Sequence, residues 1–231
     1  LTNNFIFVKN YLSMATKAKE NYLKALYHLH LKNEEISLSE LGRNLELSKP
    51  TVNNMVKKMH QNGWVKYEKY KPIKLTNEGR KNAVLVIRKH RLSEMFLSQI
   101  MGFGWEEVHD IAEELEHIKT ENLFDRMDEL LGFPNIDPHG SPIPNKEGEI
   151  VKRNYKTLAE CSVGTKVELK ALRDSSTDFL LFLNKKEIHL GSEILIHQIE
   201  SFDKSMTISY GDHSEQVLSN SISSRILVEA I

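Results

Sequence analysis

The sequence predicts a mainly helical protein that ends in a small β-barrel. Apolar residues recur at a helical period over residues 16–31 and again between about residues 80 and 131. Between these stretches, two short helical segments precede two short alternating runs, which is the order of a winged helix-turn-helix. From Thr165 onward the pattern changes to short alternating runs, which are typical of strands in a small barrel. The fold class is therefore mainly α with β.

The composition is that of a globular protein that buries a core. Of the 231 residues, 40% are apolar and 27% are charged, which argues against disorder. The longest apolar runs, 83–87 and 179–183, are five residues each, against the roughly 18–20 needed to cross a bilayer. The lone Cys161 cannot form an internal disulfide, and the first residues lack the basic region of a secretory signal. We therefore expect a cytoplasmic protein without a membrane partner.

The charge is nearly balanced overall but strongly divided along the chain. Residues 1–101 hold 18 basic and 8 acidic side chains, a net charge of +10, whereas residues 102–147 hold 3 and 12, a net charge of −9. Residues 148–231 hold 10 and 12. This division predicts a polyanionic partner for the first segment and cations for the second. The alternative is that both segments are ordinary solvated helix faces.

Residues 1–80 carry the local signals of a winged helix-turn-helix. Ser37 or Ser39 is a typical N-cap for the first short helix, and Ser48 is one for the second. Pro50 falls in a first helical turn, where its missing N–H costs little, and Gly63 is a typical helix terminator. The expected elements are helices over 16–31, 37–45 and 48–62 and strands over 64–68 and 73–76.

The second short helix of this motif normally enters the major groove of DNA. On that helix the candidates for base contacts are Ser48, Lys49, Pro50, Thr51, Asn53 and Asn54. The candidates for phosphate contacts are Lys57, Lys58, Lys66, Lys69 and Lys71. The alternative is a winged helix that binds protein or is only structural. The net charge of +10 favours double-stranded DNA.

The remaining chain divides into a helical part, a linker and a β-rich part. We expect helices over 80–101, 105–118 and 120–131, a loop rich in Pro and Gly over 134–144, and one helix over 178–186. The expected strands are 166–169, 193–196, 206–209 and 225–228. The predicted boundaries are 1–80 for the winged helix, 81–145 for the helical domain, 146–157 for the linker and 158–231 for the β domain.

Six histidines and carboxylates gather at helical spacing in the first two helices of the helical part. His90 and Glu94 are four residues apart and therefore share a helix face. His109, Glu113, Glu116 and His117 fit within about 100° of arc on the next helix. So many carboxylates on one stripe favour a counter-cation, and mixed imidazole and carboxylate donors suit a divalent transition metal. The alternative is a solvated acidic face.

Nothing in the sequence favours an enzyme. The metalloprotease motif HExxH, the nucleophile elbow GxSxG, the Walker loop and the dinucleotide fingerprint GxGxxG are all absent. A catalytic ion held by His90, Glu94 and His109 would still lack an evident nucleophile or general base. We expect no small-molecule substrate.

Four stretches together resemble the diphtheria toxin repressor family, whose members are iron- and manganese-dependent transcriptional repressors. They are residues 38–63 with SKPTV, RKHRLSE at 88–94, VHDIAEELEH at 108–117 and PHGSPIP at 138–144. The tail, with LAECSVG at 158–164 and GSE at 191–193, is similar to the SH3-like (FeoA-like) module of longer members. The resemblance implies an N-terminal winged helix-turn-helix, a helical dimerisation and metal-binding domain, and a small C-terminal SH3-like β-barrel.

The resemblance also implies two metal sites in each subunit of a homodimer. An ancillary site would use His90, Glu94, His109 and Asp174, and a regulatory site would use Glu113, Glu116, His117 and Asn21. Iron-type members have Cys at the position of Glu113 and manganese-type members have Glu, so the expected ion is Mn²⁺, with Fe²⁺ as the alternative. The implied function is repression of metal-ion homeostasis genes through operator DNA, switched on by the metal. A metal-independent winged-helix regulator is the alternative.

The chain departs from the family pattern on its first helix. Asn21 stands where the family often has Asp or Met, and an amide oxygen coordinates without adding negative charge. Lys24 stands where some manganese members place a second acidic ligand. Glu20 lies about 100° away from Asn21 on the helix and is a poor substitute for a ligand. The SH3-like module either supplies Asp174 and packs on the helical domain, which we prefer, or binds a Pro-rich peptide.

Overall fold

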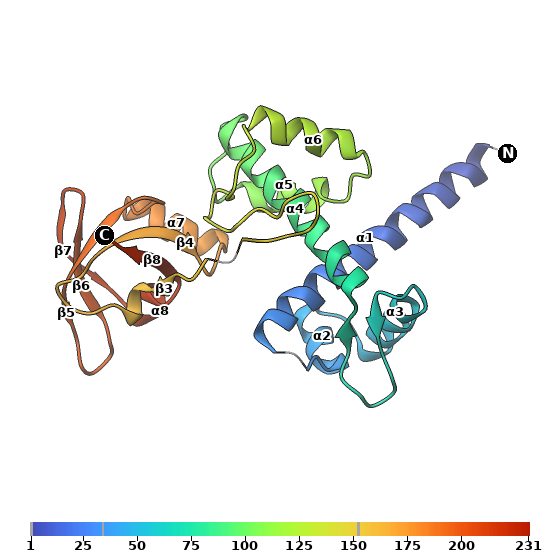
Figure 1. Ribbon diagram of the computed structural model, residues 1–231, viewed down its shortest axis with the longest axis horizontal. Helices are drawn as coiled ribbons and strands as arrows, with labels where there is room; N and C mark the ends of the chain where they lie inside the picture. The colour runs from blue at the N-terminus through green and yellow to red at the C-terminus, as the bar shows by residue number, and fades with distance from the viewer. Residues whose placement is uncertain (1, 34, 152) are drawn as a thin grey trace. The chain divides into compact units, whose positions relative to one another are not determined.

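A computed structural model describes the backbone of residues 2–33, 35–151 and 153–231 and the side chains of residues 17–33, 35–120, 122–151 and 153–231 (Figure 1). Its contacts divide the chain into two compact units. The first unit holds Leu1–His90, Glu113–Asp125 and Pro144–Ile150, and the second holds Arg91–Ala112, Arg126–Ile143 and Val151–Ile231. Helices α4 (Asn77–Gln99), α5 (Val108–Leu115) and α6 (Glu121–Leu130) contribute to both units. The predicted domain boundaries stay predictions.

The first unit contains the predicted helix-turn-helix and its wing. It is built from α1 (Thr2–Lys32), α2 (Leu38–Asn44), α3 (Lys49–Gln61) and the antiparallel strands β1 (Val65–Lys66) and β2 (Lys74–Leu75). The Ser37 side chain accepts a hydrogen bond from the Glu40 amide at 3.1 Å and caps α2. Ser48 caps α3 in the same way through the Thr51 amide. These caps and the winged helix-turn-helix are therefore confirmed.

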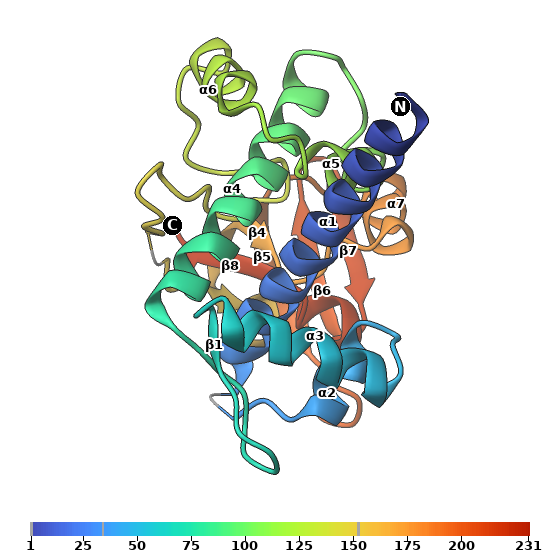
Figure 2. The same ribbon diagram turned by 90° about the vertical axis from the view of Figure 1, so that its right-hand side faces the viewer.

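The core of the first unit joins the C-terminal half of α1 to α2 and α3. Leu26, Leu41, Val52 and Met59 are all fully buried in one cluster. Figure 2 shows α1 running into the group formed by α2 and α3. Because α1 supplies one wall of this core, its orientation is tied to that of α3.

The second unit is centred on a six-stranded antiparallel sheet in the order β3-β8-β4-β5-β6-β7. The bounds are β3 (Lys156–Thr157), β4 (Lys166–Leu172), β5 (Glu193–Ile199), β6 (Met206–Tyr210), β7 (His213–Leu218) and β8 (Ile226–Ala230). The helical pieces are η1 (Leu158–Glu160), α7 (Thr177–Lys185) and α8 (Asn220–Ser223). Leu169, Leu180, Leu183 and Ile194 form its core. A sheet and a helix are confirmed here, whereas the SH3-like barrel stays a prediction.

The loop after α6 is anchored on strand β4. The amide of Leu172 donates to the carbonyl of His139 at 3.0 Å. Gly140 has a φ of +84°, and a Cβ at this position would lie 2.2 Å from the carbonyl oxygen of Lys170. Only glycine therefore fits this close approach of the loop to β4.

No helix in the described part of the chain combines the length and the apolar character that a membrane span would need.

Candidate functional site

The end of α5 brings together three of the predicted ligands. Glu113, Glu116 and His117 present donor atoms that all lie within 4.8 Å of one another. The Glu116 side chain is completely buried, whereas that of Glu113 is 32% exposed. A buried carboxylate needs a positive partner, because its charge is costly away from water. We call these three residues the α5 cluster. Its buried carboxylate is stable as an anion only beside a cation, which can be a side chain or a metal ion.

Helix α1 supplies one cation to the α5 cluster. The ammonium group of Lys24 lies 2.9 Å from both carboxylate oxygens of Glu116 and also contacts Glu113. His90 on α4 approaches Glu116 from another direction, with Nδ1 at 2.7 Å from Oε2. The structure thus brings His90, a predicted ancillary ligand, into hydrogen-bonding contact with a predicted regulatory ligand.

Two predicted regulatory ligands have buried donor atoms without a hydrogen bond. Among the described residues, neither Oδ1 of Asn21 nor Nε2 of His117 has a hydrogen-bond partner. Nδ1 of His117 lies 2.6 Å from the Glu20 carboxylate. A proton on Nδ1 would leave the Nε2 lone pair available, which is the arrangement of a metal-binding histidine. An amide oxygen and an imidazole nitrogen are donors that suit a divalent cation, and Nε2 of His117 also lies 3.5 Å from Oε1 of Glu116.

A second acidic group is buried in the other unit. Glu94, Asp137 and His139 place donor atoms within 4.8 Å of one another, and all three residues are buried. His109 joins them through Glu94, with Nδ1 at 3.3 Å from Oε1. Glu94 and His109 belong to the predicted ancillary set. Asp137 and His139 were not predicted as ligands, although His139 lies in the PHGSPIP motif and Asp137 immediately precedes it.

Burial and neighbouring charges alter the protonation of this second group. Burial raises the pKa of Asp137, and the negative charge of Glu94 raises it further. Burial alone lowers the pKa of His139, but its hydrogen bond to Glu94 and the charges of Glu94 and Asp137 outweigh that effect and raise it overall. Both groups therefore hold a proton more tightly than the free side chains do, and a bound cation would compete with that proton.

Asp174 lies outside the three clusters of metal-ligating groups found among the described residues. Its carboxylate pairs with Arg225, with Oδ2 at 2.8 Å from Nη1, and its Oδ1 accepts a hydrogen bond from the Ser176 amide. As an ancillary ligand it stays a prediction. Its participation would require the ion pair with Arg225 to open.

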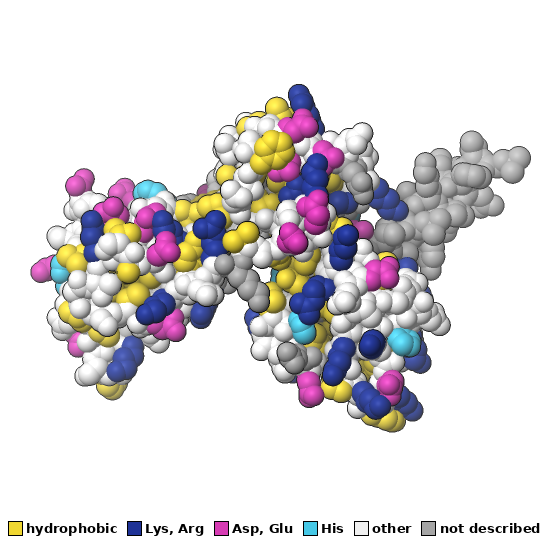
Figure 3. All heavy atoms as spheres, in the orientation of Figure 1, with side chains coloured by type: hydrophobic (Ala, Val, Ile, Leu, Met, Phe, Trp, Pro, Cys, Tyr) yellow, Lys and Arg dark blue, Asp and Glu magenta, His cyan; other side chains and the backbone are white. Residues whose placement is uncertain are grey.

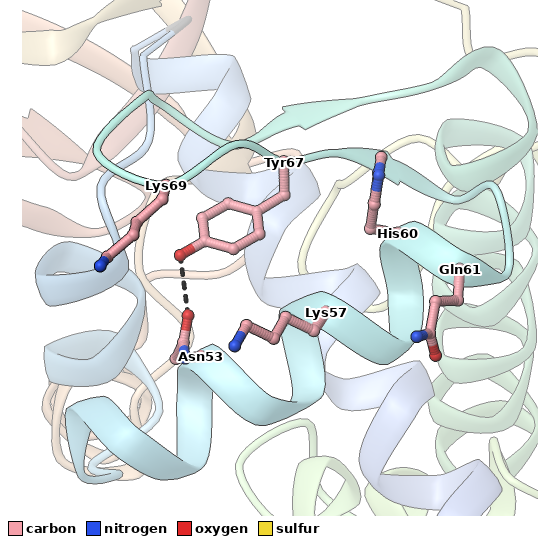
Figure 4. Close-up of a pocket in the computed structure, with 6 residues that line it drawn as sticks. All are labelled: Asn53, Lys57, His60, Gln61, Tyr67 and Lys69. Atoms are coloured by element: carbon pink, nitrogen blue, oxygen red, sulfur yellow. Dashed lines mark hydrogen bonds between the residues drawn. The ribbon is translucent and has the colours of Figure 1, made fainter.

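The predicted DNA-contacting residues lie on the surface of α3 and the wing. The exposed ones are Ser48, Lys49, Pro50, Thr51, Asn54, Lys57, Lys58, Lys66, Lys69 and Lys71, whereas Asn53 is half-buried. The Tyr67 hydroxyl donates to Oδ1 of Asn53 at 2.7 Å, and Figure 4 shows Asn53 and Lys57 on α3 facing Tyr67 and Lys69 of the wing. Figure 3 shows Lys and Arg side chains gathered over this part of the surface.

The comparisons with known proteins agree with these two kinds of site. The family description "Iron dependent repressor, N-terminal DNA binding domain" matches residues 14–73. "Iron dependent repressor, metal binding and dimerisation domain" matches residues 76–145, and "FeoA domain" matches residues 156–230. All three matches follow one another along the chain in the predicted order.

Individual relatives are also named as metal-dependent repressors. The iron-dependent repressor IdeR of Mycobacterium leprae is 36% identical over 125 residues, which is 54% of this chain and 54% of the relative, so the match spans about half of that protein. A solved manganese-dependent transcriptional repressor in complex with manganese superposes with a TM-score of 0.82 at 28% identity, covering 92% of this chain and 100% of the other. ScaR with bound Cd²⁺ superposes with a TM-score of 0.77 at 32% identity, covering 92% and 99%. The chain therefore belongs to the diphtheria toxin repressor family of iron- and manganese-dependent transcriptional repressors.

Proposed function

We propose that the protein is a homodimeric repressor that binds operator DNA when divalent cations occupy its helical domain. The observation that carries this proposal is that two buried atoms, Oδ1 of Asn21 on α1 and Nε2 of His117 just after α5, have no hydrogen-bond partner among the described residues. Buried polar atoms of this kind normally have a partner, and a ligand is one explanation for their lack of one. The match of residues 76–145 to a metal-binding and dimerisation domain supports the same interpretation.

The residues proposed to hold the cations are those of the two predicted sites. Asn21, Glu113, Glu116 and His117 would form the regulatory site, and His90, Glu94, His109 and Asp174 the ancillary site, with Asp137 and His139 as further candidates. A bound divalent cation supplies positive charge and directional coordination to these donors. Because the donors are carboxylates, imidazoles and an amide without a thiolate, we propose Mn²⁺, with Fe²⁺ as the alternative.

The junction of α1 and α5 connects the cation sites to DNA. Residues Asn21 and Lys24 contribute to the site region, while Leu23 and Leu26 of the same helix are buried in the core shared with α2 and α3. Fixing α1 against α5 therefore fixes α3. In a dimer, this would set two copies of α3 and the wing at the spacing of successive major grooves, roughly 34 Å. The predicted domain boundaries and the closed SH3-like barrel are part of this proposal.

The test is a titration of duplex DNA with the full chain. An operator is first selected from a random duplex pool with Mn²⁺-loaded protein, and its affinity is then measured by fluorescence anisotropy in Mn²⁺ and in chelator. We expect at least a tenfold loss of specific affinity in chelator, because the coupling between an effector and its response typically spans 5- to 150-fold. A second measurement of sedimentation in both conditions reports the dimer. Equal affinity in both conditions would contradict the proposal.

One observation favours a second candidate, a metal-independent winged-helix regulator. Lys24 already supplies a positive charge to Glu113 and Glu116, so part of the α5 cluster is neutralised by the chain itself. Equal and specific operator affinity in Mn²⁺ and in chelator is the result that this candidate predicts.

A further inference from the structure

We propose that Lys24 is a built-in cation that takes the place of one divalent ion in the α5 cluster and holds α1 against α5. This inference deepens the proposed function, and it rests on it in treating Glu113 and Glu116 as part of a metal centre. It concerns how many ions the metal centre binds, and how α1 contacts the α5 region when no ion is bound.

The contacts of Lys24 are those of a bridging ion. Its Nζ lies 2.9 Å from both oxygens of Glu116 and also contacts Glu113, so one ammonium group joins two carboxylates. The Glu116 side chain is 0% exposed and that of Lys24 is 14% exposed, so water screens this attraction little. An ammonium group has three N–H donors, enough for the oxygens it meets here.

A divalent ion and this ammonium group would compete for the same oxygens. Metal–oxygen bonds in carboxylate sites are about 2.0–2.2 Å long, so an ion bound to the Glu116 oxygens would have to displace the ammonium nitrogen from its place 2.9 Å away. The lysine charge also opposes any divalent ion at the neighbouring His117. The chain's own cation therefore reduces the number of ions that the cluster can hold.

Lys24 is one step in a row of contacts along a single face of α1. Lys17 pairs with Glu114 at 2.7 Å, Glu20 pairs with His117 at 2.6 Å, and Lys24 follows four residues later. Residues spaced by three or four share a helix face, so α1 contacts the α5 region over successive turns. The contact between α1 and the α5 region is thus partly formed without any divalent ion. The metal-free protein should therefore bind DNA more tightly than it would if these contacts were absent.

The experiment counts bound Mn²⁺ in the purified full chain by equilibrium dialysis and metal analysis, without DNA. Lys24→Glu replaces the ammonium group by a carboxylate beside Glu113, Glu116 and His90, a donor set that suits a divalent ion. We expect this variant to bind one more Mn²⁺ per chain than the unchanged protein. Lys17→Glu is the matched control, because it makes the same charge change on the same face, against the exposed Glu114, and it should leave the count unchanged.

Thermal unfolding gives an independent readout. In chelator, Lys24→Met should lower the melting temperature by roughly 5–10 °C, because it removes the ammonium group from the buried Glu116 carboxylate, which keeps its contact with His90. Mn²⁺ should then stabilise Lys24→Met more than it stabilises the unchanged protein, whereas Lys24→Arg should behave like the unchanged protein. Circular dichroism at low temperature checks that each variant is folded.

The outcomes separate this inference from the proposed function. Equal Mn²⁺ counts for Lys24→Glu and the unchanged protein, or an unchanged melting temperature for Lys24→Met in chelator, would overturn the role of Lys24. Operator affinity that does not respond to Mn²⁺, together with an extra ion in Lys24→Glu, would instead overturn the proposed function and leave the inference standing.

Discussion

At the scale of single residues, the two ring nitrogens of His117 have different surroundings. Glu20 binds Nδ1 at 2.6 Å, and Nε2 is buried without a hydrogen-bond partner among the described residues. Side chains that orient a metal-binding histidine in this way commonly change metal affinity by about 10- to 100-fold when removed. Glu20 and His117 therefore have different expected roles, although they contact each other.

We expect His117→Ala to abolish the response of DNA binding to Mn²⁺, because it removes a nitrogen donor. Salt-sensitive, non-specific DNA binding should remain, since the lysines of α3 and the wing are untouched. Glu20→Ala should weaken Mn²⁺ binding by about 10- to 100-fold without abolishing it. Anisotropy titrations at several Mn²⁺ concentrations measure both effects.

The exposed His197, which bonds Ser209 in the other unit, provides a control histidine. His197→Ala should keep the full Mn²⁺ response. A full response in His117→Ala would show that this residue is not a ligand.

At the scale of elements, the loop from Asp137 to Pro144 depends on one glycine. Gly140→Ala would place a Cβ 2.2 Å from the carbonyl oxygen of Lys170 at a φ of +84°. We expect a loss of about 2–4 kcal/mol in the free energy of unfolding, from the left-handed backbone and from the displaced strand. Chemical denaturation measures this loss.

Gly164 provides a control that separates the cost of the left-handed backbone from the cost of the steric clash with β4. It has a φ of +82°, but in the described part of the chain no atom lies within 4 Å of the position that a Cβ would take at this residue. Gly164→Ala should therefore cost only the left-handed backbone conformation, roughly 1–2 kcal/mol. Equal losses in the two variants would mean that the close approach of the loop to β4 contributes nothing.

Local sequence signals predicted most elements, with small errors at their ends. The caps Ser37 and Ser48 and the glycine after α3 are confirmed. The helix predicted over 80–101 runs from Asn77 to Gln99, because periodicity places a helix but not its last turn. Strand β3, with two residues, and strand β7, whose exposure does not alternate regularly, were missed for lack of a period-two signal.

The candidate site was predictable only within each helix. Helical spacing placed Glu113, Glu116 and His117 together, since that depends on neighbouring turns alone. The contact between Lys24 and Glu116 joins residues 92 apart, so it depends on the packing of α1 and no local period reveals it. Asp137 and His139 lie in a loop that has no periodicity, and their meeting with Glu94 follows from the tertiary fold.

At the scale of the whole molecule, protonation of Asp137 and His139 and binding of Mn²⁺ should each stabilise the folded chain, and the two compete because cations bind deprotonated donors. The pKa values of Asp137 and His139 are raised in the folded chain, so the folded chain binds protons more tightly than the unfolded chain. The stability contributed by His139 is complete below about pH 6.5 and is lost as the pH rises through its folded pKa. The contribution of Asp137 follows the same direction.

We therefore expect the melting temperature in chelator to be ~2–5 °C higher at about pH 6 than at about pH 8. The stabilisation by Mn²⁺ should be larger at the higher pH, because cations bind deprotonated donors. Scanning calorimetry in both buffers, with His139→Gln as the comparison, measures these differences. A melting temperature in chelator that rises with pH over this interval would refute the raised pKa values as a determinant of stability.

The continuity of α1 has a consequence for the speed of regulation. Ala25 is buried between Lys24, which touches the α5 cluster, and Leu26, which lies in the core with α3. The proposed metal site and the proposed DNA-contacting helix α3 thus both contact the same turns of α1, so we expect loss of the ion to tilt α1 without unfolding it. Rapid-mixing measurements should accordingly find that release from DNA keeps pace with the departure of the ion, with no slower step of chain reorganisation after it.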